Sequence, residues 1–181
     1  VVKDNGRQVR TCPLVLQDNR YFIDFARLEE LFRQGIRLLI FCNPHNPGGR
    51  VWTREELAKL GELSLKYNVL VVSDEIHCDL ALRGNKYIPY ASVSTEMAEN
   101  SITCLAPSKT FNIPGIQSSC VVSYNQERKE VIQKRLKALN LNMPNCFVPE
   151  VVKACYEQGA HWLDEVLQYI EENLDTALEF I

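Results

Sequence analysis

Four short apolar runs, accompanied by segments of helical periodicity, limit the possible folds more than any other feature of the sequence. The runs are rich in Val, Ile, Leu and Cys and lie within residues 36–42, 69–75, 101–108 and 118–124. Continuously apolar strands are typical of parallel sheets that carry helices on both faces. The chain is therefore predicted to form an α/β domain, three-layer α/β/α with a mostly parallel sheet, incomplete at both ends.

Two helices with clear end signals are expected, one before and one after the first apolar strand in the sequence. Residues 25–35 place their Phe and Leu side chains on one face, and Gly35 is a suitable residue to follow the last turn. Residues 53–68 begin with Thr53, three residues before Glu56, which is the spacing of a capping box. These signals predict one helix on each side of the first apolar strand.

Further helices are expected in the last third of the chain. From Pro149 the sequence is predicted to be helical to its end, with a break near Gly159. Residues 126–140 form an amphipathic pattern, with apolar side chains on one side at Val131, Ile132, Leu136 and Leu139.

Charge and cysteine usage exclude several classes of function. The 181 residues carry 20 basic and 23 acidic side chains, and this net charge of −3 leaves no basic surplus for nucleic acid. No apolar run approaches the length of a membrane span, so neither nucleic acid nor membrane is an expected partner. The seven cysteines form no C-x-x-C pair and several lie in apolar runs, which favours reduced, buried thiols in a cytoplasmic protein.

The chemistry-bearing residues follow the predicted strands, where parallel α/β sheets bind their ligands. After the first strand comes "NPHNPGG", in which Pro44 and Pro47 restrict the backbone and the two glycines relieve crowding. Asn46 therefore offers a side-chain amide on a stiff loop. Turn formation alone is a sufficient alternative reason for an Asn at this position.

An acidic residue and a lysine follow the next two strands. Asp74 comes directly after an apolar strand, where a carboxylate either caps a turn or stabilises a cation. Together with Glu75 and His77 it could also hold a metal. Lys109 follows the third strand beside small residues; most lysines are simply exposed, but a partly desolvated one is a good nucleophile for a carbonyl.

An amide, a carboxylate and a lysine at neighbouring strand ends together fit one ligand, pyridoxal 5′-phosphate (PLP). Lys109 would form the Schiff base, Asp74 would keep the pyridine nitrogen protonated, and the Asn46 amide would bond the ring 3-oxygen. A metal site would leave the Asn-Pro-x-Asn-Pro turn and the lysine without a function.

The order of three motifs carries a family resemblance. "NPHNPGG", "SDEIHCDL" and "SKTFNIPG" follow one another at intervals of about thirty residues. From about Phe25 onward, the chain resembles the large domain of a fold-type I PLP enzyme of the aminotransferase class I/II superfamily. This resemblance implies the same roles for Asn46, Asp74 and Lys109, and it implies that Ser108 contacts the cofactor phosphate.

Two departures from the usual pattern concern the type of reaction. His77 stands where aminotransferases of this superfamily carry Tyr, and Gln117 stands where they usually carry a phosphate-binding Arg. In both respects the chain resembles the cystathionine β-lyase-like branch, the MalY/PatB-type carbon–sulfur lyases. The resemblance implies α,β-elimination of L-cystathionine or related cysteine S-conjugates to a thiol, pyruvate and ammonia. It also implies that His77 binds at the cofactor, where its ring either tunes the 3-oxygen through a hydrogen bond or ring contact or only packs. Without the Arg, the cofactor phosphate would rely more on Ser108 and on backbone groups.

Two other functions stay open at this point. An aminotransferase would use the same cofactor residues, and some domains of this fold bind effectors in transcription regulators. The resemblance further implies a homodimer. It also implies that residues 1–159 are part of a PLP-binding large domain, and that residues 160–181 begin a long helix toward a small C-terminal domain outside this chain.

Overall fold

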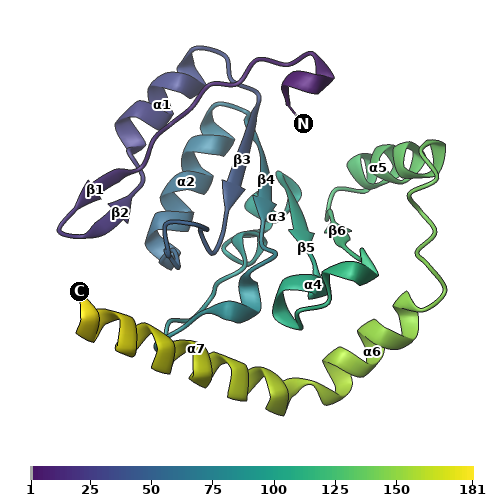
Figure 1. Cartoon of the computed structure of the whole chain (residues 1–181). Coiled ribbons are helices and arrows are strands. Elements are labelled where there is room, and N and C mark those ends of the chain that lie inside the picture. Colours follow the sequence, from purple (N-terminus) through teal and green to yellow (C-terminus); the bar gives the residue numbers. More distant parts are fainter. Residues whose placement is uncertain (1) are drawn as a thin grey trace.

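A four-stranded sheet forms the centre of the computed structural model, which describes residues 2–181 (Figure 1). Its order is β3-β4-β5-β6, and the first three strands are parallel while β6 runs antiparallel to β5. The α/β class and the mostly parallel sheet are therefore confirmed. The strand bounds are β3 (Leu38–Cys42), β4 (Leu70–Asp74), β5 (Ser101–Leu105) and β6 (Cys120–Val122).

Seven helices accompany the sheet within residues 2–181. In Figure 1, the last two continue one another in an arc below the sheet, and the C-terminus returns toward the hairpin formed by β1 (Val15–Gln17) and β2 (Arg20–Phe22). The helices are α1 (Phe25–Arg33), α2 (Arg54–Lys66), α3 (Thr95–Glu99), α4 (Pro107–Thr110), α5 (Gln126–Ala138), α6 (Val148–Gln158) and α7 (Ala160–Phe180). Short 3₁₀ turns are η1 (Lys3–Asn5), η2 (Cys78–Leu80), η3 (Tyr90–Ser92) and η4 (Pro114–Ile116).

The predicted helix ends are confirmed. The Glu56 backbone N–H donates to Thr53 Oγ1 over 3.2 Å, and the Thr53 N–H donates to Glu56 Oε2 over 2.8 Å, which completes the capping box. Gly35 follows α1 with a φ of +93°, a conformation that favours glycine. The break near Gly159 separates α6 from α7.

The core lies between one face of the sheet and helices α1 to α3. Trp52 and Tyr90 are fully buried there, and the Phe41 ring lies 5.7 Å from the Trp52 ring, measured between centroids. The Trp52 indole N–H donates to the Cys42 carbonyl over 2.9 Å, so the largest core side chain also satisfies its polar atom. The buried cluster consists of Leu28, Phe32, Phe41, Trp52, Leu57, Leu60, Val69, Val71, Tyr90 and Met97.

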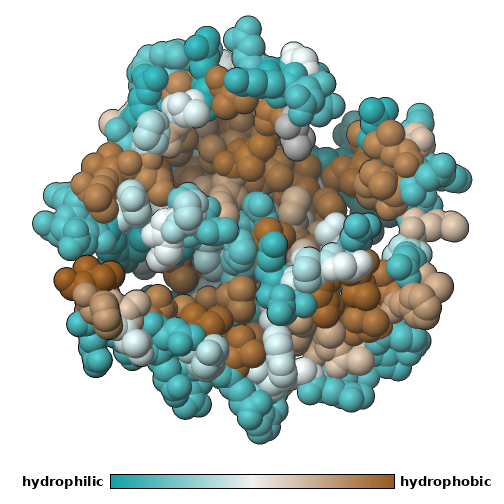
Figure 2. Space-filling model, viewed as in Figure 1, coloured by the Kyte–Doolittle hydropathy of each residue, from teal (hydrophilic) through white to brown (hydrophobic). Residues whose placement is uncertain are grey.

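The opposite face of the sheet is open to solvent. Leu38 and Ile40 alternate with the buried residues of β3 and are 47% and 57% exposed. A cavity of about 870 Å³ lies beside them, lined mainly by residues 8–14, α1 and β3. Figure 2 shows hydrophobic surface gathered in a hollow over the sheet.

The last strand differs from its prediction. Residues 118–124 were expected to contain a strand buried on both faces, but β6 is an edge strand in which Cys120 and Val121 are exposed. Its apolar sequence predicts the strand correctly, whereas its burial depends on what lies next to it.

The cysteines are only in part as expected. All seven are free, and five are half-buried, but Cys120 and Cys146 are exposed, so the prediction of buried thiols is wrong for these two. Burial, reinforced by the neighbouring Asp79, raises the pKa of Cys78 to about 12. None of the helices within residues 2–181 combines the length and the apolar character needed to cross a bilayer.

Candidate functional site

The turn after β3 is fixed to the rest of the sheet by Asn43. This residue is fully buried; its backbone N–H donates to the Asp74 carbonyl, and its side-chain amide donates to the Ile88 carbonyl, each over 2.9 Å. Both Asn-Pro peptide bonds, Asn43–Pro44 and Asn46–Pro47, are cis. The first Asn of the motif therefore anchors the turn and does not face a ligand.

The tip of the turn is closed on itself. The His45 N–H donates to the Arg50 carbonyl over 2.7 Å, and the Gly48 N–H donates to His45 Nδ1 over 3.2 Å. A Cβ atom at Gly48 would lie only 2.6 Å from that nitrogen, so any side chain there would displace the ring. Burial lowers the pKa of His45, in keeping with a neutral ring that accepts this hydrogen bond.

The second Asn of the motif projects outward and meets His77. Asn46 is exposed, and its Nδ2 lies 3.2 Å from His77 Nε2, on the loop after β4. The Asn46 backbone N–H is 3.5 Å from Cys42 Sγ, at the end of β3. Two of the predicted site residues, 31 positions apart in sequence, are thus in direct contact.

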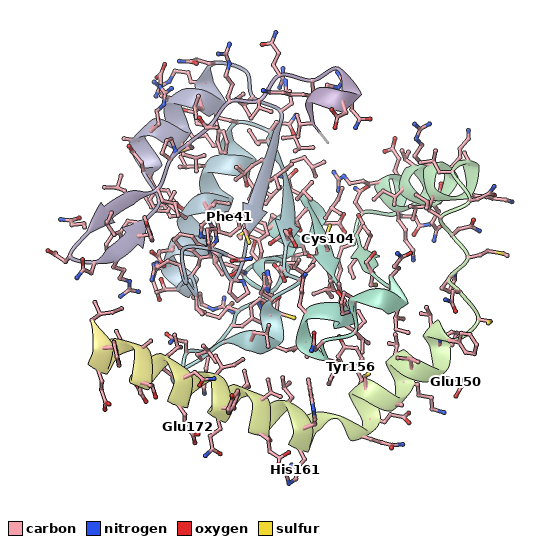
Figure 3. All side chains as sticks on the ribbon, in the orientation of Figure 1. Phe41, Cys104, Glu150, Tyr156, His161 and Glu172 are labelled. Carbon is pink, nitrogen blue, oxygen red and sulfur yellow. The ribbon has the colours of Figure 1, made fainter. Side chains whose placement is uncertain are left out.

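Asp74 lies at the carboxyl end of β4, as predicted. The sheet register places it between Cys42 on β3 and Cys104 on β5, all three pointing to the open face (Figure 3 labels Cys104). Asp74 is half-buried, and its carboxylate accepts a long hydrogen bond, 3.4 Å, from the Ile76 N–H. Burial raises the pKa of both neighbouring thiols, and the carboxylate raises it further.

Glu75 points to the opposite face and is fully buried. Its carboxylate accepts hydrogen bonds from Ser73 Oγ over 2.6 Å, from the Tyr90 N–H over 2.9 Å, and from the Tyr87 hydroxyl. Burial, together with this carboxylate, raises the pKa of Tyr87 above its ordinary value. A carboxylate with these partners has a structural role beside Asp74.

The metal alternative has no support among residues 2–181. No group of three or more His, Cys, Asp or Glu side chains is arranged to hold an ion there. The physical reason is the alternation along the strand: Asp74 and Glu75 face opposite sides of the sheet, so the two carboxylates cannot share one ligand.

Lys109 lies on α4, directly after β5, and therefore at the same edge of the sheet as Asp74. The flanking Pro107 and Thr110 are buried, and Thr110 Oγ1 donates to Asp79 over 2.8 Å, which ties α4 to the turn after β4. Ser108 is half-buried, whereas Lys109 itself is exposed. The partly desolvated setting considered for this lysine is therefore absent within residues 2–181.

Gln117 ends the η4 turn with a φ of +53°, and its side chain is exposed. The structure brings together Asn46 and His77 and carries Asp74 and Lys109 to adjacent strand ends. The sequence reasoning missed the supporting contacts of Cys42, Glu75 and Thr110. Of these, only Glu75 had a usable signal, since strand alternation turns it to the face opposite Asp74.

The donor set fits a pyridine ring that carries an oxygen and a phosphate. An amide donor, a half-buried carboxylate, a primary amine and a hydroxyl are supplied by Asn46, Asp74, Lys109 and Ser108. The carboxylate has one long hydrogen bond from Ile76, which leaves acceptor capacity for a protonated ring nitrogen. These residue types could hold PLP at the carboxyl edge of the sheet.

Comparison with known proteins finds a matching family and similar relatives. The profile of the family described as aminotransferase class I and II matches residues 1–179. Cystathionine beta-lyase PatB of Bacillus subtilis (strain 168) is 46% identical over 182 residues, covering 100% of this chain and 47% of PatB. Protein MalY of Escherichia coli (strain K12) is 31% identical over 175 residues, covering 96% of this chain and 44% of MalY.

Among solved structures, that of cystalysin from Treponema denticola, which contains a pyridoxal 5′-phosphate cofactor, matches with a TM-score of 0.96 at 34% identity. The match covers 99% of this chain and 46% of cystalysin. The chain spans about half the length of the curated relatives that it matches.

Proposed function

Because the chain belongs to the aminotransferase class I and II family, we propose that it forms the cofactor-binding part of a PLP-dependent carbon–sulfur β-lyase. The main support for this proposal is the placement of Asp74 and Lys109 at adjacent strand ends. Asn46 and His77 are in contact beside them. The similarity to a relative named cystathionine beta-lyase supports elimination as the reaction. The proposed substrates are L-cystathionine or related cysteine S-conjugates.

Four side chains would hold the cofactor. Asn46 would donate a hydrogen bond to the ring 3-oxygen, Asp74 would keep a proton on the pyridine nitrogen, and Ser108 would donate to the phosphate. Lys109 would supply the amine that attaches the cofactor. When bound, PLP supplies an electron sink for the negative charge that develops at the substrate α-carbon.

The chain's own chemistry then centres on proton transfer by Lys109. Its amine would remove the α-proton of the amino acid as a general base, and it would return a proton to the departing thiol as a general acid. Exposure of Lys109 on α4 leaves the amine accessible to a substrate. Asp74 would keep the pyridine nitrogen protonated throughout, because its carboxylate accepts only one long hydrogen bond, from the Ile76 N–H, and so has acceptor capacity left for the ring.

The surrounding architecture is also a proposal. Residues 1–159 would be part of the PLP-binding large domain, and α7 would begin the connection toward a small C-terminal domain. The full-length protein would act as a homodimer.

Replacement of Lys109 tests this function. In the full-length protein, Lys109→Ala should remove the visible absorbance of the attached cofactor and lower pyruvate release by roughly 10²–10⁴-fold, because both the amine and the general base are lost. Lys109→Arg is the matched control: it keeps the positive charge but cannot attach the cofactor. Normal pyruvate release from either variant would exclude the assignment.

The same assay separates the lyase from an aminotransferase. The full-length protein should release pyruvate and a free thiol from L-cystathionine without any keto acid present. Turnover that requires a keto acid would instead identify an aminotransferase using the same residues.

A further inference from the structure

The contact between Asn46 and His77 joins the loops after two neighbouring strands. Asn46 Nδ2 and His77 Nε2 are 3.2 Å apart, which is hydrogen-bonding distance. An amide nitrogen carries two hydrogens and no acceptor site, so Nε2 has to be the acceptor. This hydrogen bond therefore uses the imidazole tautomer that has its proton on Nδ1.

The contact with His77 uses one of the two orientations of the Asn46 amide. A side-chain amide has a donor on one side and an acceptor on the other, and half a turn about its last bond exchanges them. Only one orientation presents Nδ2 to an unprotonated Nε2. In that orientation Nδ2 still has a second N–H to donate.

Both partners of this hydrogen bond lie on segments that make further contacts. The Asn46 N–H is 3.5 Å from Cys42 Sγ. The His77 carbonyl accepts from the Leu80 N–H over 3.0 Å, within the turn that Thr110 ties to α4 over 2.8 Å. The helix that carries Lys109 is thus linked to the turn that begins at His77.

We propose that His77 is a positioning residue that acts through Asn46. By accepting one N–H of the Asn46 amide, His77 holds the amide so that its second N–H is reserved for the 3-oxygen of the cofactor ring. This inference rests on the proposed function and assigns His77 a role that needs no direct contact with the cofactor.

A double-mutant cycle in the full-length holoenzyme tests it, with the pH midpoint of the cofactor's visible absorbance change as the readout. A donor to the 3-oxygen favours its anionic form, so losing the donor should raise that midpoint. His77→Phe keeps a ring but removes the acceptor, and the expected rise is about 0.5–1 pH unit for one hydrogen bond. His77→Gln places an amide oxygen at a reach similar to Nε2 and should stay near the wild-type value.

The second arm uses Asn46→Ala as the background. If His77 acts only through Asn46, adding His77→Phe to this background should cause no further shift. An equal shift in both backgrounds would show direct contact of His77 with the cofactor and overturn the proposal. The proposal also fails if His77→Phe causes no shift beside an intact Asn46, or if His77→Gln behaves like His77→Phe.

Two controls keep the outcome interpretable. His77→Leu replaces His77→Phe if the larger ring prevents folding, since it also lacks an acceptor. Lys109→Ala is measured alongside: if that variant keeps its visible band, the proposed function itself fails. If Lys109→Ala behaves as expected and the cycle does not, only the role of His77 is wrong.

Discussion

Helices α2 and α5 are both thirteen residues long, and both begin at a side chain that accepts a backbone N–H. In α2, Leu57 and Leu60 are buried against the sheet. In α5 no residue is buried, and Val131 is 64% exposed although it lies on the apolar side of the pattern. Local signals thus produce equally regular helices, while packing depends on the elements that neighbour each one.

The largest effect of a substitution on the free energy of unfolding is expected at Leu57, in the packed helix α2. Leu57→Ala removes a fully buried side chain from the core and should lower the free energy of unfolding by about 2–5 kcal/mol. Urea denaturation followed by Trp fluorescence measures this, because Trp52 lies in the same cluster. Leu57→Met is the matched control and should cost much less; similar losses for both would mean that the site is not tightly packed.

The next largest effect on stability should come from the hydrogen bonds that the buried Glu75 carboxylate accepts. Glu75→Leu leaves the Ser73 and Tyr87 hydroxyls and the Tyr90 N–H without their acceptor, and should cost about 2–3 kcal/mol in unfolding free energy. Glu75→Gln keeps one acceptor oxygen and should lose less. An unchanged denaturation midpoint for Glu75→Leu would show that these donors find other partners.

The N-caps of α2 and α5 allow a direct comparison of the two helices, because in each the cap side chain accepts a backbone N–H from the first turn. Thr53→Ala should lower global stability by about 1 kcal/mol, since α2 unfolds together with the core. Asn125→Ala removes the corresponding acceptor, 2.9 Å from the Arg128 N–H, and should increase amide exchange within α5 while leaving the global transition in place. Equal global losses for the two variants would show that α5 is coupled to the core.

The smallest effect is expected at Val131. Val131→Ser should change the free energy of unfolding by less than about 0.5 kcal/mol, because the side chain buries little surface in α5. A loss comparable with that of Leu57→Ala in the full-length protein would identify a partner surface that covers this helix.

The sequence predicted those parts of the fold whose signals are local. The capping box at Thr53, the end of α1 at Gly35 and the break at Gly159 each depend on a few adjacent residues, and the structure has all three. The hairpin of β1 and β2 was missed although it has such a signal. Asp18 and Asn19 have φ values of +48° and +58°, as a tight hairpin turn requires.

The parts that could not be predicted depend on residues distant in sequence. Glu75 is satisfied by Tyr87 and Tyr90, twelve and fifteen positions away, and no periodic pattern indicates that pairing. The exposure of Lys109 and of β6 likewise depends on which other segments pack against them, and a local pattern does not specify that. For the candidate site, the order of the motifs predicted which strand ends carry Asn46, Asp74 and Lys109, whereas the Asn46–His77 contact required coordinates.

The repeated Asn-Pro dipeptide has a consequence for redesign of this turn. Asn43 is enclosed and bonded to backbone on two neighbouring segments, while three positions later Asn46 faces outward. A library that varies both positions together would therefore mix variants that lose the turn with variants that only change the contacts of Asn46. Keeping Asn43 constant and varying Asn46 with His77 as a pair would confine the search to variants that still form the turn.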